Sequence, residues 1–239
     1  MKIFLIIISI ITSILVAAQS PIVTKLPQID TTYNQKLTGA FLVENKQFIG
    51  SQYIQDKWSA GRILLTTGKS VDCEALKYNG LLDELIWLNV HNSGIFVVDK
   101  LGITDFWITD SNNNQKHFQK ISLYQDSKDS TKNIFAELVF DREMKLYVHR
   151  KISIQGFQFL IVNDIKRKYD ILRSTPIYYI RLPKGEYKVI NKLNRKTILA
   201  NMLLYQNEIN RIVKSSRLNL KNEIDFIKLI EQLNLAIKD

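Results

Sequence analysis

The sequence predicts an α+β protein, in which a mostly antiparallel β meander, closed as a barrel or folded as a sandwich, precedes a C-terminal α-helical hairpin. Short apolar segments separated by turn residues follow one another from residue 39 to residue 190, which is typical of an antiparallel sheet. Several segments alternate apolar and polar residues, as strands with one buried face do. After Asn191 the apolar residues recur every three or four positions, which predicts helices.

The first residues have the form of a secretory signal peptide. A basic start at Met1-Lys2 precedes a mostly apolar run over residues 3–16, and Val16-Ala17-Ala18 supplies small residues before a cleavage position. The run of about 14 residues is shorter than the roughly 20 that a spanning helix needs, which favours cleavage after Ala18 over a retained anchor. We therefore expect residues 1–18 to be removed and the protein to act outside the cytoplasm, in the periplasm or at the outer surface. No further transmembrane segment is expected.

The remainder divides into three expected parts. Residues 19–38 are mainly polar, contain two prolines and predict an extended lead-in. Residues 39–190 predict the β domain, and residues 191–239 predict a helical hairpin packed on it. Asn79-Gly80 predicts a tight hairpin, because both residues tolerate a positive φ. The first strands expected in the β domain are 62–66, 71–75, 84–90, 95–98, 103–109, 118–124 and 134–140.

The clearest alternation comes later in the β domain. Over residues 144–149 every second residue is apolar, so one side of this strand is predicted to face the core. Tyr147 and His149 on the other side are predicted to face solvent. Residues 152–162 predict a pair of strands that turn near Gly156.

The chain is predicted to end with a β-hairpin followed by two helices. The hairpin joins residues 176–182 and 186–190 across a Pro-Lys-Gly turn. Asn222 is expected to cap the second helix. The apolar residues that share one face of the first helix are Ile198, Met202, Tyr205, Ile209 and Ile212. Those of the second helix are Phe226, Ile230, Leu233 and Ile237.

A few local features recur together in this chain. Trp58-Ser59-Ala60-Gly61 precedes one expected strand, Thr67-Gly68 follows it, and Leu76-Lys77-Tyr78-Asn79 ends the next. With the Lys-rich helix that starts near Lys221, this pattern resembles a group of uncharacterised exported proteins of Bacteroidetes-type Gram-negative bacteria. These share a W-x-x-G … G … L-K-Y-D/N segment and a terminal helical pair. The resemblance implies a β-rich architecture with C-terminal helices and a periplasmic or outer-surface location, and it implies no catalytic residue.

Positive charge is concentrated in the second part of the chain. Residues 19–140 hold 12 Lys and Arg against 13 Asp and Glu, whereas residues 141–239 hold 20 against 10. This asymmetry favours an anionic partner, namely a lipid head group, an acidic glycan or an acidic protein, and the plain alternative is a Lys-rich compositional bias.

The densest basic cluster is the first candidate binding site. It consists of Lys166, Arg167, Lys168 and Arg173. The cluster predicts either a weak, salt-sensitive peripheral contact with an anionic membrane or a solvated turn between strands. Export from the cytoplasm argues against nucleic acid as the partner.

Aromatic residues of the β part are the second candidate. Tyr53 and Trp58, like Trp87 and Trp107, would stack on a sugar or a peptide if they lie on the sheet surface, and would belong to the core if they face inward. Tyr53 and Trp58 are therefore named with the basic cluster as candidate ligand-binding residues.

Patterns that indicate a metal site or catalysis are weak. The lone Cys73 has no cysteine partner for zinc or for an internal disulfide, so we expect it to fill a strand position. Asp72 and Glu74 lie on one side of a strand, as a solvated pair does, whereas glycosidases oppose two carboxylates across a cleft. No metal and no cofactor are expected. The histidines, all isolated in the sequence, are His91, His117 and His149.

These observations predict an exported, non-enzymatic binding or structural protein of the cell envelope, with an envelope component or a protein as its partner. The alternative is an envelope-directed hydrolase whose site is assembled from distant strands. Convergence of a histidine with a carboxylate in a concave pocket would favour the hydrolase.

Overall fold

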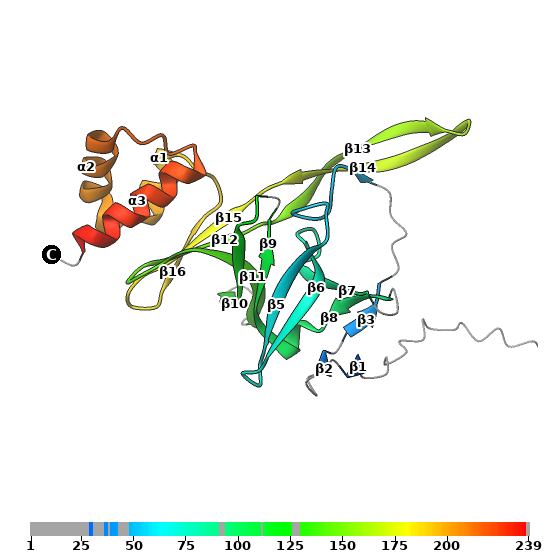
Figure 1. The fold of residues 1–239 in the computed structure, drawn as a ribbon. Helices are drawn as coiled ribbons and strands as arrows, with labels where there is room; N and C mark the ends of the chain where they lie inside the picture. The colour runs from blue at the N-terminus through cyan, green and yellow to red at the C-terminus, as the bar shows by residue number, and fades with distance from the viewer. Residues whose placement is uncertain are drawn as a thin grey trace, which may run out of the picture.

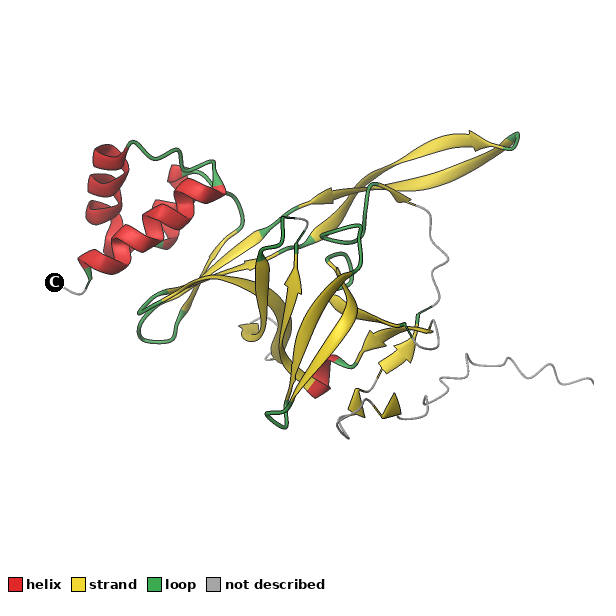
Figure 2. Cartoon of the chain, in the orientation of Figure 1, coloured by secondary structure: helices red, strands yellow, loops and turns green. Residues whose placement is uncertain are grey.

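The computed structural model describes residues 29–30, 36–37, 39–42, 48–90, 94–110, 112–125 and 130–237. Strands make up most of this part of the chain, and the helices gather at its C-terminal end (Figures 1 and 2). The arrangement confirms the predicted α+β fold class, mostly antiparallel with C-terminal helices. The expected signal peptide and most of the expected lead-in lie outside the described residues.

Most strands belong to one large antiparallel sheet. They are β3 (Gly39–Phe41), β5 (Ser59–Leu65), β6 (Ser70–Asn79), β7 (Glu84–Asn89), β8 (Gly94–Val98), β9 (Ile103–Thr109), β10 (Gln115–Gln125), β11 (Ser130–Asp141), β12 (Lys145–His149), β15 (Ile177–Arg181) and β16 (Tyr187–Ile190). Among the described residues these eleven strands have the spatial order β16-β15-β12-β11-β10-β9-β5-β6-β7-β8-β3. A short 3-10 helix, η1 (Lys100–Gly102), joins β8 to β9.

Two smaller sheets lie beside it. The first pairs β1 (Ile29–Asp30) with β2 (Lys36–Leu37). The second joins β13 (Ile152–Val162), β14 (Ile165–Ser174) and β4 (Phe48–Ile49).

Strand β6 shows how closely local patterning specifies this sheet. Val71, Cys73 and Ala75 are buried, and Asp72 and Glu74 between them are exposed, as the alternation predicts. The hairpin after β6 is also present, but for a different reason than a positive φ at Asn79-Gly80. The Asn79 carboxamide oxygen accepts hydrogen bonds from the backbone N–H groups of Leu81 and Leu82 at 3.0 and 3.1 Å, which is a side-chain-stabilised turn. The left-handed residue of this turn is Asp83, with φ of 59°.

The large sheet curls around an aromatic core. Tyr78, Phe106, Phe118 and Phe135 are fully buried, and the rings of Phe106 and Phe118 stack with centroids 4.7 Å apart. These residues come from β6, β9, β10 and β11. Since β6 and β11 lie four places apart in the strand order, the sheet must bend back on itself to bring Tyr78 to Phe135. Curling of one sheet therefore encloses this core.

Strand β12 is buried on both sides, so the predicted exposure of Tyr147 and His149 is wrong. Met144, Leu146 and Val148 face the helices, as expected for the apolar side. Tyr147 packs on the opposite side with residues of β10, β11 and β15, and it is 2% exposed, against 6% for His149. Side-chain polarity alone predicts that Tyr147 and His149 face solvent, but the curl of the sheet covers this side of the strand.

The hairpin of β13 and β14, here called the arm, projects away from the large sheet and the helices (Figure 1). Its two strands pair along their whole length, so the predicted turn near Gly156 is wrong. Gly156 lies instead at a β-bulge within β13. The turn is formed by Asn163 and Asp164, with φ of 52° and 61°, the geometry of a tight two-residue hairpin. The basic cluster that begins at Lys166 is consequently part of a strand and does not form a turn.

The base of the arm is held by the rest of the protein. The backbone N–H of Ile152 donates to the carbonyl of Gly80 at 2.9 Å, and the hydroxyls of Ser153 and Thr175 are hydrogen-bonded at 2.7 Å. Leu172 is buried. Strand β4 adds in parallel to β14 at the same end. The base of the arm is therefore fixed to the rest of the protein.

The C-terminal helices are α1 (Arg195–Asn201), α2 (Gln206–Ser216) and α3 (Glu223–Ala236), with the 3-10 turn η3 (Leu203–Tyr205) after α1. The first predicted helix is thus broken at Met202, although its apolar residues still face the core. The predicted cap of α3 is confirmed, because the Asn222 side chain accepts from the backbone N–H of Ile224 at 2.8 Å. Within the described residues no helix combines the length and the apolar character needed to cross a membrane.

Several polar contacts attach α3 to the sheet. The buried Asn234 carboxamide accepts from the backbone N–H of Met144 at 2.8 Å. Arg150, just after β12, forms ion pairs with Glu137 of β11 at 2.5 Å and with Glu223 of α3 at 2.8 Å. These bonds fix the orientation of a helix whose apolar side is already buried on β12, β15 and β16.

Truncation of Phe226 should destabilise the protein strongly. Its ring is fully buried and meets Tyr178 edge-on at 5.5 Å, so Phe226→Ala should lower the free energy of unfolding by about 3–5 kcal/mol. Ile224→Ala, on the same helix at a side chain that is 64% exposed, should change it by no more than about 0.5 kcal/mol. Urea denaturation of both variants measures the difference, and similar values would show that α3 is not packed on the sheet.

Candidate functional site

One side of the arm combines aromatic rings with lysines. The register places Phe157 opposite Asp170, Phe159 opposite Lys168 and Ile161 opposite Lys166, so these side chains share one face of the hairpin. The Lys166 ammonium lies 4.7 Å from the centroid of the Phe159 ring, and that of Lys168 lies 4.5 Å from the Phe157 ring. These are cation–π distances. The lysine stems therefore cover the rings while their charged ends stay in water.

The other side of the arm is apolar near its tip as well. Val162 and Ile165 face each other beside the turn, and Leu160 faces Arg167. Ile165 is 55% exposed and Ile161, on the first face, is 76% exposed. Among the described residues, six of the fifteen exposed large apolar side chains lie within residues 154–165: Ile154, Phe157, Phe159, Ile161, Val162 and Ile165. The distal arm thus shows apolar and cationic side chains on both faces.

The predicted basic cluster is only partly gathered. Lys166, Arg167 and Lys168 lie together on the distal half of β14 and are exposed. Arg173 is also exposed but lies at the base of the arm, where it pairs with Ser153. Sequence inspection missed the aromatic partners of these cations, because Phe157 and Phe159 resemble core residues until the strand is known to project into solvent.

The two predicted aromatic residues meet around a third residue, Lys77, which is not among the predicted ligand-binding residues. The Lys77 ammonium lies 4.9 Å from the ring centroids of both Tyr53 and Trp58. All three side chains are half-buried, so the two rings are occupied by a contact with the Lys77 ammonium within the protein. Tyr53 and Trp58 lie in the segment before β5, whereas Lys166, Arg167 and Lys168 lie beyond the middle of the arm.

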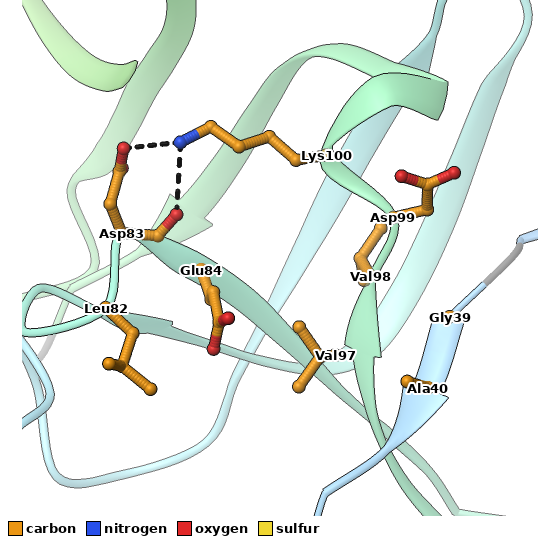
Figure 3. A pocket seen from close by; sticks show the side chains of 9 residues that line it. All are labelled: Gly39, Ala40, Leu82, Asp83, Glu84, Val97, Val98, Asp99 and Lys100. Atoms are coloured by element: carbon orange, nitrogen blue, oxygen red, sulfur yellow. Dashed lines mark hydrogen bonds and ion pairs between the residues drawn. The ribbon is translucent and has the colours of Figure 1, made fainter. Parts of the chain in front are cut away.

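A second polar cluster, the Asp83 cluster, lies where the β6–β7 turn meets β11. The Asp83 carboxylate accepts from the Tyr78 hydroxyl at 2.5 Å and from the backbone N–H of Phe135 at 3.1 Å. Its other oxygen lies 2.5 Å from the Lys100 ammonium, which also donates to the Asp83 carbonyl at 3.3 Å (Figure 3). Burial, followed by the charge and the hydrogen bond of Asp83, raises the pKa of the Tyr78 hydroxyl well above its ordinary value. Tyr78 therefore stays a proton donor to Asp83.

Beside this cluster is a cavity of about 490 Å³ (Figure 3). Apolar side chains of Leu82, Val97 and Val98 line it together with Asp83, Glu84 and Asp99. Two of its three carboxylates have structural partners. Asp83 pairs with Lys100, and the Asp99 carboxylate accepts from the backbone N–H of Leu101 at 2.9 Å. Burial raises the pKa of Glu84 against the opposing effect of Lys100.

His149 lies at the edge of the Asp83 cluster. Its Nε2 atom is 4.0 Å from an Asp83 carboxylate oxygen and has no hydrogen-bond partner. Burial, only partly opposed by the Asp83 charge, lowers the pKa of His149 to about 4. The imidazole is consequently neutral at neutral pH.

His117 is the histidine that converges with a carboxylate. Its Nε2 atom lies 2.7 Å from Asp105, and its ring stacks on Trp107 at 4.4 Å. Burial of Asp105 opposes ionisation, but hydrogen bonds from His117, Thr104 and Gln119 lower its pKa overall. The pair joins adjacent strands and lines none of the three cavities whose lining residues are described. His91 lies outside the described residues.

The remaining sequence candidates have ordinary surroundings. Burial, with a smaller effect of Asp72, raises the pKa of Cys73 to about 12, so this thiol is protonated and a poor nucleophile. Asp72 and Glu74 line an open groove of about 540 Å³, in which Asp72 pairs with Arg62 at 2.6 Å. In the part of the chain that the structure describes, no group of three or more His, Cys, Asp or Glu side chains is placed to hold a metal ion.

Replacement of His149 should change how stability depends on pH. Its pKa is about 4 in the folded state and about 6.5 in the unfolded chain. Above pH 6.5 neither state binds the proton, whereas between about pH 6.5 and pH 4 only the unfolded state does. The free energy of unfolding should therefore fall by about 1.4 kcal/mol for each unit by which the pH is lowered within this window. His149→Gln should lack this component in urea denaturation at pH 7, 6 and 5, and parallel curves for the two proteins would contradict it.

Loss of the Asp83 carboxylate should be costly. Asp83→Ala would leave the Tyr78 hydroxyl, the Phe135 N–H and a partly buried Lys100 without their acceptor, so unfolding should become easier by about 3–5 kcal/mol. The matched control is Asp72→Ala in the exposed pair with Arg62, which should cost no more than about 1 kcal/mol. Thermal and urea denaturation compare the two. Equal effects would mean that Asp83 does not hold the curled sheet together.

Comparisons with known proteins found no similar protein, so a function has to be proposed from the sites described above. No protein-family model, no curated protein and no solved structure matches this chain. The resemblance to exported proteins of Bacteroidetes-type bacteria therefore stays a prediction.

Proposed function

We propose that the protein is an exported binding protein of the cell envelope that attaches to its partner through the β13–β14 arm. The observation that carries this proposal is the exposed apolar and cationic surface on both faces of the distal arm. Exposed apolar patches on a folded protein mark interaction sites. A two-stranded hairpin alone in water is only marginally stable, so an arm of this composition is suited to having its side chains covered.

The charge of the arm limits the kinds of partner that it can bind. Lys166, Arg167 and Lys168 are successive and exposed, and together with the rings they favour a surface that offers both negative charge and apolar contact. Electrostatic attraction speeds the encounter and apolar burial prolongs the contact. The fixed base of the arm supports this role, because a held hairpin loses little conformational freedom on binding.

An envelope-directed hydrolase is the second candidate. The His117–Asp105 pair at 2.7 Å is the observation in its favour, since a histidine oriented by a carboxylate is the core of many hydrolytic sites. We rank it second because both side chains are tied to the sheet surface by Gln119 and Trp107.

Attachment through the arm can be tested with envelopes isolated from the native host. The double variant Phe157→Ser/Phe159→Ser removes two exposed rings that contribute no core packing, so the fold should persist while binding weakens at least tenfold. Leu203→Ser/Leu204→Ser is the matched control, because these leucines are 68% and 90% exposed at the helical end of the protein. Co-sedimentation with the envelopes measures the bound fraction, and melting curves check the fold. Equal retention of both variants and the parent would reject the arm as the attachment site.

A further inference from the structure

We infer that the partner of the distal arm is an anionic lipid bilayer, in whose head-group region residues 157–168 are immersed. This inference rests on the proposed function and names its partner. It depends on three properties of the arm: apolar side chains on both faces, cations on both faces, and backbone edges that limit how deeply the hairpin enters.

The two-faced distribution of apolar side chains favours a surrounding medium over a flat partner. Phe157, Phe159 and Ile161 lie on one face, whereas Val162 and Ile165 lie on the other. A protein that docks on a single surface covers one face of a hairpin and leaves the other in water. A bilayer interface covers both faces at once, because lipid chains and head groups close around the inserted element.

The cations are placed to meet phosphate groups around the whole arm. Lys166 and Lys168 share the face of the phenylalanine rings, and Arg167 lies on the opposite face. Long basic side chains at a membrane extend their stems along apolar surface and their charges toward the head groups. Aromatic rings prefer the same interfacial depth. Each Lys or Arg near an anionic surface strengthens attachment several-fold.

The backbone limits the depth of insertion. In the described part of the chain, β13 pairs only with β14, and β14 gains β4 only at Asp170 and Ile171. The outer edges of the distal arm therefore present backbone N–H and C=O groups. Such groups cannot enter the hydrocarbon region without partners, and the turn residues Asn163 and Asp164 are polar as well. Immersion consequently stops in the hydrated head-group region, with the apolar side chains reaching beyond it.

The geometry of the whole protein agrees with this depth. The arm projects away from the sheet on the side opposite the helices (Figure 1), so its tip is the first of the described elements to meet a surface on that side. The fixed base at Ile152 and Leu172 keeps the body of the protein in the aqueous phase.

Binding to vesicles of defined composition tests this inference with the full chain. Neutral vesicles contain phosphatidylcholine alone, and anionic vesicles contain phosphatidylcholine with about 30% phosphatidylglycerol, whose negative head groups attract basic side chains. We expect flotation with the anionic vesicles to exceed flotation with the neutral ones by at least tenfold in apparent affinity.

Two arm variants separate the contributions. Lys166→Gln/Arg167→Gln/Lys168→Gln should remove the preference for anionic vesicles, and Phe157→Ser/Phe159→Ser should weaken binding to vesicles of either kind. Lys228→Gln, which alters an exposed lysine on α3, and Leu203→Ser/Leu204→Ser should behave like the parent. The rings contribute a part of the binding that does not depend on salt. In 0.5 M NaCl, where the Debye length is about 4 Å, the parent should therefore bind the anionic vesicles more weakly, and the Phe157→Ser/Phe159→Ser variant should be released completely.

The outcomes distinguish this inference from the proposed function. The inference of a lipid partner would be overturned if the arm variants bound vesicles as the parent does, or if the parent did not bind vesicles at all. If vesicles fail to bind while envelopes still bind through the arm, the partner is a protein or a glycan and the proposed function stands. If neither vesicles nor envelopes depend on the arm, both the inference and the proposed function are rejected.

Discussion

The curled sheet depends on one carboxylate. Asp83 sits in the turn between β6 and β7 and binds the backbone of Phe135 on β11, a strand that lies four places from β6 in the sheet. Tyr78 and Lys100 hold the same carboxylate from β6 and η1. This contact joins two parts of a sheet that hydrogen bonding between neighbouring strands leaves open. The aromatic core that the curl encloses, and the base from which the arm leaves, rely on that closure.

The structure separates two kinds of polar surface. In the Asp83 cluster, charges are paired, partly buried and hydrogen-bonded to the backbone, so they stabilise a shape. On the distal arm, the cations are exposed beside exposed rings, and the ion pair described for them is a long one, between Lys168 and Asp170 at 3.9 Å. That contrast is why we regard the first cluster as structural and propose binding only for the second, although both contain lysine and aromatic side chains.

Local patterns predicted the elements well where each depends on its own residues. Strand β9 has the predicted bounds, the alternation of β6 matches its burial, and Asn222 caps α3 as its side chain suggests. Prediction failed where distant segments decide. Strand β12 is covered on both sides only because the helices and the curled sheet meet there. Glycine is a common turn signal and points to Gly156, whereas the turn is formed by Asn163 and Asp164 with φ of 52° and 61°. Charge alone predicts the group of Lys166, Arg167 and Lys168. Asp83 was missed because its contact with Phe135 spans 52 positions, and Lys77 was missed because both of its rings come from the segment before β5.

Arg150 has a mechanical consequence. It follows β12 and precedes the first residue of the arm by two positions, and it links Glu137 of the sheet to Glu223 at the start of α3. A pull on the tip of the arm therefore reaches three elements at one guanidinium group and is shared between them, so no single strand bears it alone. If the arm attaches the protein as we propose, this junction spreads the load over β11, β12 and α3.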